Sequence, residues 1–192
     1  MIIRSFKELS YYISSDAYRY TGSRECLKTL KLYLSQISFR YLFWMRSCCY
    51  FKHRRAFSPL FLLSYLYLRH LSFKSGIQIP YCTQIGPGFY IGHFGTIIVN
   101  GNAIIGKNVN ISPGVNIGVA NRGCHKGTPI IGDEVYMAPG AKIIGKVIIG
   151  NNVAIGANAV VTKDIPANAC VAGVPANILS MDGAISYVNR KI

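Results

Sequence analysis

The side chains best suited to acid–base chemistry in this sequence are its four histidines, His53, His70, His93 and His125. An imidazole titrates close to neutral pH, so it can take a proton from a substrate hydroxyl under physiological conditions. His53 and His70 lie among basic and aromatic residues, and we expect them to be structural. For His93 and His125, a solvated surface histidine is the ordinary alternative to a chemical role.

The six cysteines predict neither a metal centre nor a disulfide framework. Their positions, 26, 48, 49, 82, 124 and 170, show no C-x-x-C spacing and no regular pattern. Zinc sites and small disulfide-rich domains both depend on such patterns. We therefore expect no metal, and the cysteine usage favours a reducing, cytoplasmic location.

The element that must position His93 is a repeat of six residues in the second half of the chain. A period of six fits neither an α-helix nor a plain alternation of inward and outward residues. It fits a three-sided coil in which each short strand ends at a tight corner and the repeated apolar residue points inward. This spacing, broken by one eight-residue and one 14-residue step, joins Ile85, Ile91, Ile97, Ile105, Ile111, Ile117, Ile131, Met137, Ile143, Ile149, Ile155 and Val161. The periodicity predicts a β-solenoid but not its handedness.

Glycine follows seven of these apolar residues, and asparagines recur between them. Both residue types tolerate a positive φ angle, so we expect Asn108, Asn110, Asn151 and Asn152 at corners. The 14-residue step keeps the phase of the repeat on both sides, which predicts a protruding loop over residues 119–129.

The first 75 residues are predicted to be α-helical. Gly22 is the only glycine before Gly76. Residues 27–41 contain apolar side chains spaced by three and four, which indicates an amphipathic helix, and a second helix is expected from about residue 60 to residue 73. The longest apolar stretch, residues 57–68, is too short to cross a bilayer, and no signal peptide is read.

Positive charge is concentrated in the same region. Residues 1–76 contain 13 lysines and arginines against three acidic residues, which is about +10 of the net charge of +14. Cations interleaved with aromatic rings favour peripheral contact with an anionic membrane through residues 27–75. A helical cap that packs its aromatic face on the rest of the protein is the alternative, and no nucleic acid is expected as a partner.

The repeats, together with the ending VTKDIPANACVAGVPANIL (161–179), resemble the bacterial hexapeptide-repeat acyltransferases. Within that group, GIQIPYCTQIGPGFYIGHFGTIIV (76–99) resembles serine O-acetyltransferase and its relatives that acetylate capsular and lipopolysaccharide sugars. The resemblance implies a mostly β fold, with a left-handed parallel β-helix over residues 76–180 as the catalytic domain. A helical region (1–75) precedes it and a tail (181–192) follows. It also implies acetyl-CoA as co-substrate and a homotrimer with active sites between subunits.

By resemblance, His93 is the general base that takes the proton from the acceptor. Three positions depart from the serine-specific pattern. Gln78 stands where the family has the aspartate that orients the histidine, Gly92 where it has an aspartate beside the histidine, and Thr128 where it has a second histidine. Gly92 and Thr128 lack the charges that would hold a zwitterionic amino acid. A neutral sugar hydroxyl is therefore the expected acceptor, with Gln78 accepting from the imidazole N–H.

The resemblance also places acetyl-CoA in a groove lined by small residues. These are Gly118, Val119 and Ala120, then Pro139 and Gly140, then Ala157, with Lys163 as a partner for the phosphates. The loop at 119–129 contains Arg122, His125 and Lys126. His125 is a rival to His93 for the base and a candidate acceptor contact, although a solvated loop accounts for these residues equally well.

These observations predict an acetyl-CoA-dependent O-acetyltransferase that acts on a sugar hydroxyl of a capsular polysaccharide, O-antigen or exopolysaccharide, or of a precursor. Two alternatives stay open. The first is serine O-acetylation in cysteine biosynthesis, and the second is a non-catalytic trimeric β-solenoid scaffold.

Overall fold

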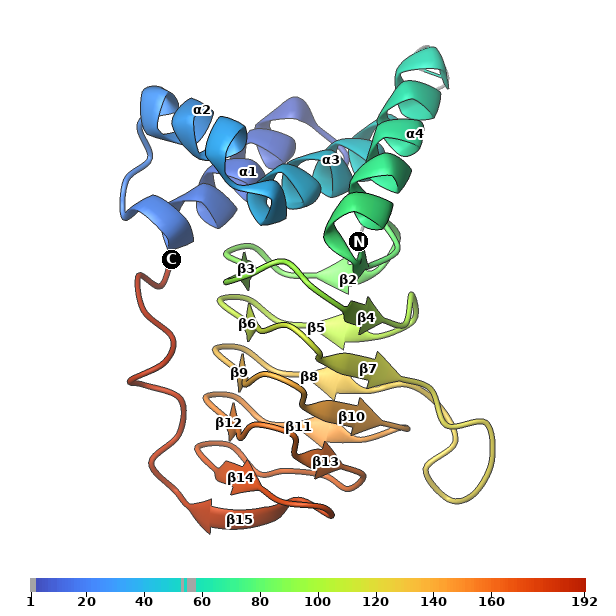
Figure 1. Cartoon of the computed structure of the whole chain (residues 1–192), viewed down its shortest axis with the longest axis vertical. Coiled ribbons are helices and arrows are strands. Elements are labelled where there is room, and N and C mark those ends of the chain that lie inside the picture. Colours follow the sequence, from blue (N-terminus) through green and yellow to red (C-terminus); the bar gives the residue numbers. More distant parts are fainter. Residues whose placement is uncertain (1–2, 53, 55–57) are drawn as a thin grey trace.

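A computed structural model describes residues 3–52, 54 and 58–192, and it consists of a layer of helices above a three-sided column of short strands (Figure 1). The four helices are α1 (Phe6–Thr21), α2 (Cys26–Ser35), α3 (Ile37–Lys52) and α4 (Ser58–Ser75). His53, which we expected to be structural, lies outside the described residues. Within the described residues, no helix is long and apolar enough to span a bilayer.

Local sequence explains where α1 begins and ends. The Ser5 hydroxyl accepts a hydrogen bond from the Glu8 N–H at 3.1 Å, and the Glu8 carboxylate accepts from the Arg4 N–H at 2.6 Å. The first bond satisfies a backbone donor that the helix start leaves free, and the second holds the residue before the cap against the first turn. Gly22 ends the helix in the left-handed conformation, with a φ angle of 69°. The helix predicted near residues 60–73 is confirmed by α4.

The single helix expected over residues 27–41 is wrong in two respects. The chain leaves the helical conformation at Gln36, and the Arg40 guanidinium donates to the carbonyls of Tyr33 and Leu34 at the end of α2. These bonds satisfy carbonyls that a continuous helix would have paired within itself. The predicted apolar face of α2 also points outward, since Leu27 is 79% exposed and Leu34 66% exposed, and Leu32 is the buried leucine of this helix.

Three parallel sheets form the sides of the column. Sheet A contains, in spatial order, β1 (Ile77–Gln78), β4 (Ile97–Val99), β7 (Asn116–Gly118), β10 (Lys142–Ile144) and β13 (Val160–Val161). Sheet B contains β2 (Gln84–Ile85), β5 (Ile104–Ile105), β8 (Ile130–Ile131) and β11 (Ile148–Ile149). Sheet C contains β3 (Tyr90–Ile91), β6 (Asn110–Ile111), β9 (Tyr136–Met137), β12 (Ala154–Ile155), β14 (Cys170–Ala172) and, antiparallel to β14, β15 (Asn177–Ser180).

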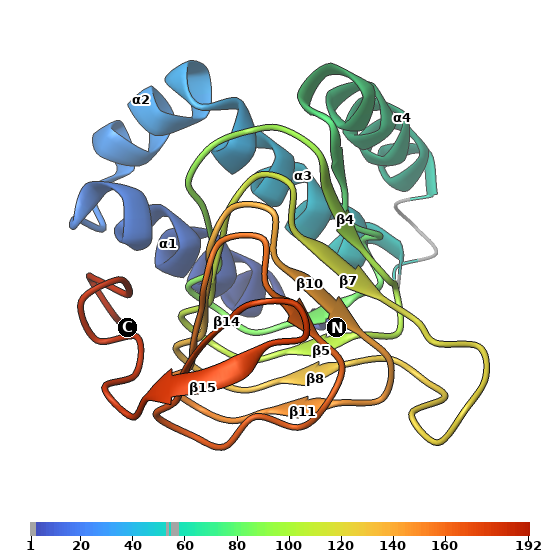
Figure 2. The ribbon, with the colours of Figure 1, turned by 60° about the horizontal axis from the view of Figure 1, so that its bottom comes forward.

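All twelve residues of the predicted repeat point into the column, and none is more than 2% exposed. Their register is in phase from coil to coil: Ile85 pairs with Ile105, and Ile105 pairs with Ile131. Each coil therefore buries its apolar residues against the equivalent residues of the next coil, as expected for a solenoid. The prediction of a three-sided β-solenoid is confirmed, and Figure 2 shows its triangular outline.

The chain turns at three corners in every coil. We name them the A/B corner (79–83, 100–103, 119–129, 145–147 and 162–164), the B/C corner (86–89, 106–109, 132–135, 150–153 and 166–169) and the C/A corner (92–96, 112–115, 138–141 and 156–159). Asn108 and Asn152 adopt positive φ angles of 56° and 55°, as predicted. Asn151 also lies at the B/C corner, without a positive φ angle, and its side chain accepts a hydrogen bond from the Asp133 N–H, whereas Asn110 lies in β6 and not at a corner.

Glycines of the B/C corner stack directly on one another along the column. A Cβ atom at Gly86 would lie 2.7 Å from the backbone of Gly106, and one at Gly106 would lie 2.6 Å from the backbone of Gly132. Real Cβ atoms do not approach backbone this closely, so these positions exclude side chains. This packing is the physical reason for glycine after the apolar residue in those repeats.

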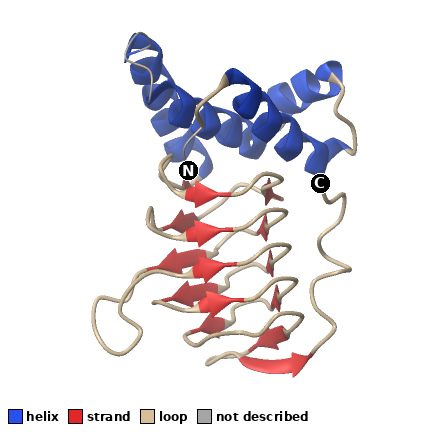
Figure 3. Ribbon diagram, turned by 180° about the vertical axis from the view of Figure 1, so that it is seen from behind, coloured by secondary structure: helices blue, strands red, loops and turns tan. Residues whose placement is uncertain are grey.

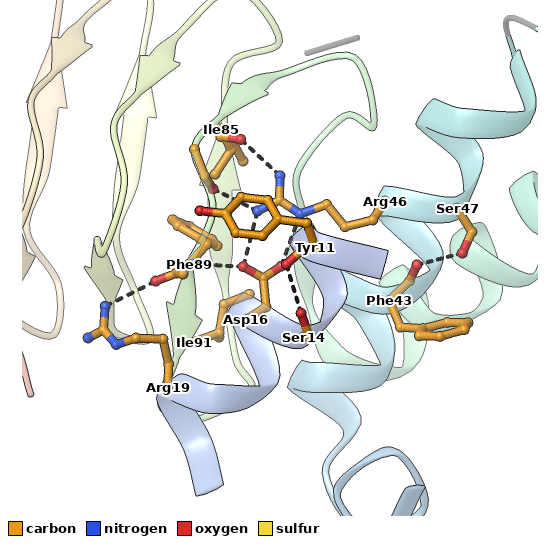
Figure 4. A network of polar contacts seen from close by, with 12 residues as sticks. Tyr11, Ser14, Asp16, Arg19, Phe43, Arg46, Ser47, Ile85, Phe89 and Ile91 are labelled. Atoms are coloured by element: carbon orange, nitrogen blue, oxygen red, sulfur yellow. Dashed lines mark hydrogen bonds and ion pairs between the residues drawn. The ribbon is translucent and has the colours of Figure 1, made fainter. Parts of the chain in front are cut away.

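The helical layer is joined to the first coil by a buried ion pair (Figure 4). The Arg46 guanidinium contacts the Asp16 carboxylate at 3.0 Å, and both side chains are almost fully buried. Asp16 also accepts from the Phe89 N–H at 2.9 Å, while Arg46 donates to the carbonyls of Ile85 and Gly86 at 2.8 Å. Burial raises the pKa of Asp16, and Arg46 opposes that rise. The pair thereby satisfies backbone groups at the open end of the β-helix, which no further coil covers.

The C-terminal residues run back along the column toward the helices (Figures 1 and 3). Tyr187 stacks on Tyr136 with ring centroids 4.5 Å apart, and its carbonyl accepts from the Asn110 side chain. Lys191 pairs with Glu134, and the Arg190 guanidinium donates to the carbonyl of Tyr20 in α1. This segment lies along the B/C corner and sheet C, so it leaves the face of sheet A uncovered.

Candidate functional site

His93 lies at the C/A corner of the first coil, in the turn between β3 and β4, and its side chain is exposed. The strand before it is held by α1, because the Tyr20 hydroxyl donates to the Ile91 carbonyl at 2.9 Å and accepts from the Ile91 N–H at 3.0 Å. Burial raises the pKa of Tyr20, so this hydroxyl keeps its proton. The turn after His93 is held by a hydrogen bond from the Gly95 N–H to the Ser75 carbonyl. His93 is thus an exposed imidazole on a fixed turn.

Gln78 lies in β1, the first strand of sheet A, and is exposed on the outer face of that sheet. It pairs with Ile98 of β4, the strand that follows the His93 turn. Gln78, at the start of the first coil, and His93, at its end, therefore lie one strand apart along sheet A. Among the described residues, no hydrogen bond joins the Gln78 amide to the imidazole.

Three of the residues expected at the acetyl-CoA groove lie on the same edge as His93. Pro139 and Gly140 form the C/A corner of the third coil, and Ala157 lies in the C/A corner below it. Pro139 and Ala157 are exposed. Gly140 has a φ angle of 77°, which by itself explains glycine at this corner. Gly92, beside His93, is half-buried.

The other predicted residues lie on the opposite edge of sheet A. Gly118 ends β7, and Val119 and Ala120 begin the loop that protrudes from the A/B corner (Figure 2). Thr128 ends this loop and donates to the Asn102 carbonyl at 3.1 Å. Lys163 is exposed at the A/B corner of a lower coil.

The predicted loop is present and is braced at both ends. Ala120 and Gly127 exchange backbone hydrogen bonds of 3.0 and 2.9 Å, and the His125 carbonyl accepts from the Lys146 N–H at 2.8 Å. The side chains of Arg122 and His125 are exposed.

The structure therefore divides the predicted site into two groups separated by the width of sheet A. Within one chain, His125 and Thr128 do not lie near His93. The strands of sheet A run from the C/A corner, which contains His93, to the A/B corner, which contains the loop at 119–129.

A pocket of about 640 Å³ lies between α4 and the first strands of sheet A, and Gln78 forms part of its wall. Tyr41 of α3 also lines it, and the Tyr41 hydroxyl donates to the Ile79 carbonyl and accepts from the Ile79 N–H. Burial raises the pKa of Tyr41 to about 12. Our sequence analysis did not identify this pocket. The available signal was the recurrence of aromatic residues around Arg69.

Among the described residues, no group of three or more histidine, cysteine, aspartate or glutamate side chains lies close enough together to hold a metal ion. Cys26, Cys82 and Cys124 are exposed, and burial raises the pKa of Cys48 to about 12.

Comparison with known proteins relates the chain to one group of transferases. Residues 128–163 match the family model described as bacterial transferase hexapeptide (six repeats). A serine acetyltransferase of Staphylococcus aureus is 39% identical over 111 residues, which is 58% of this chain and 52% of the relative. That of Staphylococcus xylosus is 37% identical over 123 residues, 64% of this chain and 57% of the relative. The chain thus spans about half the length of the curated relatives it matches.

Solved structures extend the similarity to the helices. The serine acetyltransferase of Neisseria gonorrhoeae, in complex with serine, superposes with a TM-score of 0.72 at 26% identity, over 92% of this chain and 71% of that one. A serine acetyltransferase in complex with CoA gives a TM-score of 0.68 at 26% identity, over 90% and 68%. The expected fold and resemblance are confirmed: the chain is a left-handed parallel β-helix of hexapeptide repeats behind an α-helical N-terminal region.

Proposed function

We propose that this left-handed β-helix is an acetyl-CoA-dependent O-acetyltransferase, with residues 76–180 as its catalytic unit. The observation that supports it most directly is His93, exposed on a fixed corner of the first coil within the segment that resembles serine acetyltransferases. The relatives found by sequence and by structure are serine acetyltransferases, and one of them is solved with CoA.

In this proposal, neutral His93 is the general base. It accepts the proton of the acceptor hydroxyl while the hydroxyl oxygen attacks the thioester carbonyl carbon of acetyl-CoA. The tetrahedral intermediate collapses, the carbon–sulfur bond breaks, and the thiolate of CoA takes the proton from the imidazolium. An exposed backbone N–H of the C/A corner stabilises the oxyanion. We assign Gln78 to accept from the second imidazole nitrogen in the substrate complex, a hydrogen bond that the described contacts lack, with less stabilisation of the imidazolium than a carboxylate supplies.

Acetyl-CoA binds between two chains of a homotrimer. Gly118, Val119 and Ala120 supply one wall, and the C/A corners of the neighbouring chain supply the other through Pro139, Gly140 and Ala157. Lys163 pairs with the phosphates. The support for this arrangement is the separation of the two groups across sheet A, which leaves each chain with half of the groove. Light scattering of the purified protein tests it, with a trimer expected and a stable, active monomer as the contrary result.

The comparisons favour L-serine as the acceptor over the sugar that we expected from the sequence. The relatives are named for serine, and no relative reported above is named for a sugar. A sugar hydroxyl is the second candidate, supported by residues of this chain. Gly92 and Thr128 supply no charge for an amino acid's ammonium or carboxylate, and Gln78 replaces a carboxylate.

Acetyl-CoA consumption with L-serine and with a panel of sugars, for the wild type and His93→Ala, tests both candidates. Efficient turnover of serine at low concentration excludes the sugar as the main acceptor, and the reverse preference excludes serine. Undiminished turnover by His93→Ala refutes the general base. Absence of both CoA binding and thioester consumption leaves the scaffold alternative.

We also propose that the helical region contacts an anionic membrane surface from the cytoplasmic side. The exposed leucines of α2, Leu27, Leu30 and Leu34, lie beside Lys28 and Lys31. On α4, a second exposed apolar surface is formed by Leu62, Leu63 and Leu66. Apolar side chains flanked by cations favour a lipid interface. Contact with the same surface of a second chain is disfavoured, because two basic surfaces repel one another. Flotation with phosphatidylserine vesicles at low salt tests this, and absence of binding refutes it.

A further inference from the structure

The pocket between α4 and sheet A is lined by residues of α3 and α4, of the first two strands of sheet A, and of the corner that follows β1. Tyr65, Arg69 and Phe73 come from α4 and form one wall. The other wall consists of Gln78 of β1, Tyr81 of the following corner, and Ile98 of β4. The volume of about 640 Å³ lies within the usual range of small-molecule sites, and it exceeds what a single serine fills.

This pocket adjoins the turn that contains His93. Gly76, at the end of α4, lines the pocket and contacts the turn directly, since a Cβ atom at Gly76 would lie 3.1 Å from the carbonyl carbon of Gly95. The Ile97 N–H donates to the Gly76 carbonyl at 3.2 Å. One end of the pocket therefore lies against the turn that contains His93, and Gln78 forms part of the pocket wall.

The side chains of the pocket are those that recognise a sugar ring. Tyr65 and Tyr81 lie edge to face with ring centroids 6.1 Å apart, and both are only partly buried. Aromatic faces pack against the C–H groups of a pyranose, while phenolic hydroxyls and the Gln78 amide can bond its hydroxyl groups. An apolar wall with a few polar groups is the ordinary composition of a small-molecule site.

The charge of the pocket indicates one further property of its ligand. Of the described residues that line it, Arg69 is the only charged one, and it lies over the ring of Phe73 at 5.1 Å. Within the described part of the chain, no carboxylate forms an ion pair with Arg69. A planar guanidinium in such a setting binds a carboxylate or a phosphate through paired hydrogen bonds.

We propose that this pocket binds the acceptor and selects a pyranose with an acidic substituent, either a carboxylate or a phosphate, which pairs with Arg69. This inference rests on the proposed acetyl transfer with the second candidate acceptor, a sugar, and it names the class of that sugar. The acidic group anchors the sugar against α4, and a free hydroxyl of the ring extends to His93.

Binding without acetyl-CoA tests the pocket independently of catalysis. Saturation-transfer NMR titrations compare D-glucuronate, glucose 1-phosphate, D-glucose and L-serine on the wild type, Arg69→Gln and Lys74→Gln. Lys74 is an exposed cation on the same helix outside the pocket, so it is the matched control. We expect at least one acidic sugar to bind about 10-fold or more tightly than glucose, with the stronger of the two identifying carboxylate or phosphate. Arg69→Gln weakens it about 10- to 100-fold, and Lys74→Gln leaves it unchanged.

Equal binding of glucose and the acidic sugars, an unchanged affinity in Arg69→Gln, or no binding of either acidic sugar overturns the proposal. So does L-serine binding that depends on Arg69 in the same way.

Steady-state kinetics separate this inference from the proposed function. Arg69→Gln raises the KM for the acidic sugar and leaves the KM for acetyl-CoA unchanged, whereas His93→Ala removes transfer and leaves sugar binding intact. Transfer that needs His93 but ignores Arg69 refutes the pocket alone. Sugar binding that needs Arg69, without acetyl transfer to any hydroxyl, refutes the proposed function alone.

Discussion

Replacement of Arg46 by methionine tests how the helical layer is held to the β-helix. The guanidinium is fully buried and bonds the Asp16 carboxylate and the carbonyls of Ile85 and Gly86. Methionine fills similar volume without any donor. Asp16 is then left buried with the Phe89 N–H as its remaining partner among these contacts.

Removal of one partner of a buried ion pair costs about 3–5 kcal/mol of the free energy of unfolding, because the other charge stays desolvated. The carbonyls of Ile85 and Gly86 also lose their donor, and each loss costs about 1–3 kcal/mol. This cost overlaps with the loss of the ion pair, so we do not add it to the cost of about 3–5 kcal/mol. For a chain of this size, each kcal/mol corresponds to about 2–4 °C, so Tm should fall by about 6–20 °C.

Urea and thermal unfolding of Arg46→Met, Asp16→Leu and the double variant measure this cost. The double variant should lose less stability than the sum of the single variants, because neither charge is then left alone. Arg24→Met, an exposed arginine near α2, is the control and should change stability by less than about 0.5 kcal/mol. A loss below about 1 kcal/mol for Arg46→Met, or strict additivity in the double variant, would refute the reasoning.

Three further results are expected. His93→Ala should lower kcat by about 10²- to 10⁴-fold with an unchanged Kd for CoA, measured by a thiol-release assay and by calorimetry; a loss of CoA affinity instead would point to a structural role. Cys48 should resist iodoacetamide at pH 8, since its raised pKa leaves little thiolate, while exposed Cys124 reacts; mass spectrometry of the alkylated peptides reads both, and modified Cys48 in the folded protein contradicts its burial. Gly106→Ala should destabilise by about 1–3 kcal/mol because its Cβ would meet the Gly132 backbone at 2.6 Å, whereas Gly101→Ala, with its nearest contact at 3.5 Å, should unfold at nearly the wild-type urea concentration; similar losses in both variants would exclude the steric explanation.

The six-residue period by itself determined the architecture of the second half of the chain. Each repeated residue, such as Ile105 or Met137, needs only to follow its neighbour by six positions to lie inside the column. The coils are then stacked by contacts between adjacent repeats, which a sequence displays directly. The loop at 119–129 was found for the same reason, since it interrupts a regular pattern, whereas His93 was singled out by the family resemblance.

Only the tertiary structure decided which of these residues lie near one another. The period places Thr128 and His93 on corners, but the width of sheet A separates them, and only the packing of the coils shows that. The helical half has no repeat to fix its contacts. Asp16, Arg46 and Arg69 therefore read as ordinary helix charges until α1, α3 and α4 are placed on the first coil. Contacts between residues 30 or more positions apart depend on that placement, and it is what buries the first two of these charges and turns the third into the wall of a pocket.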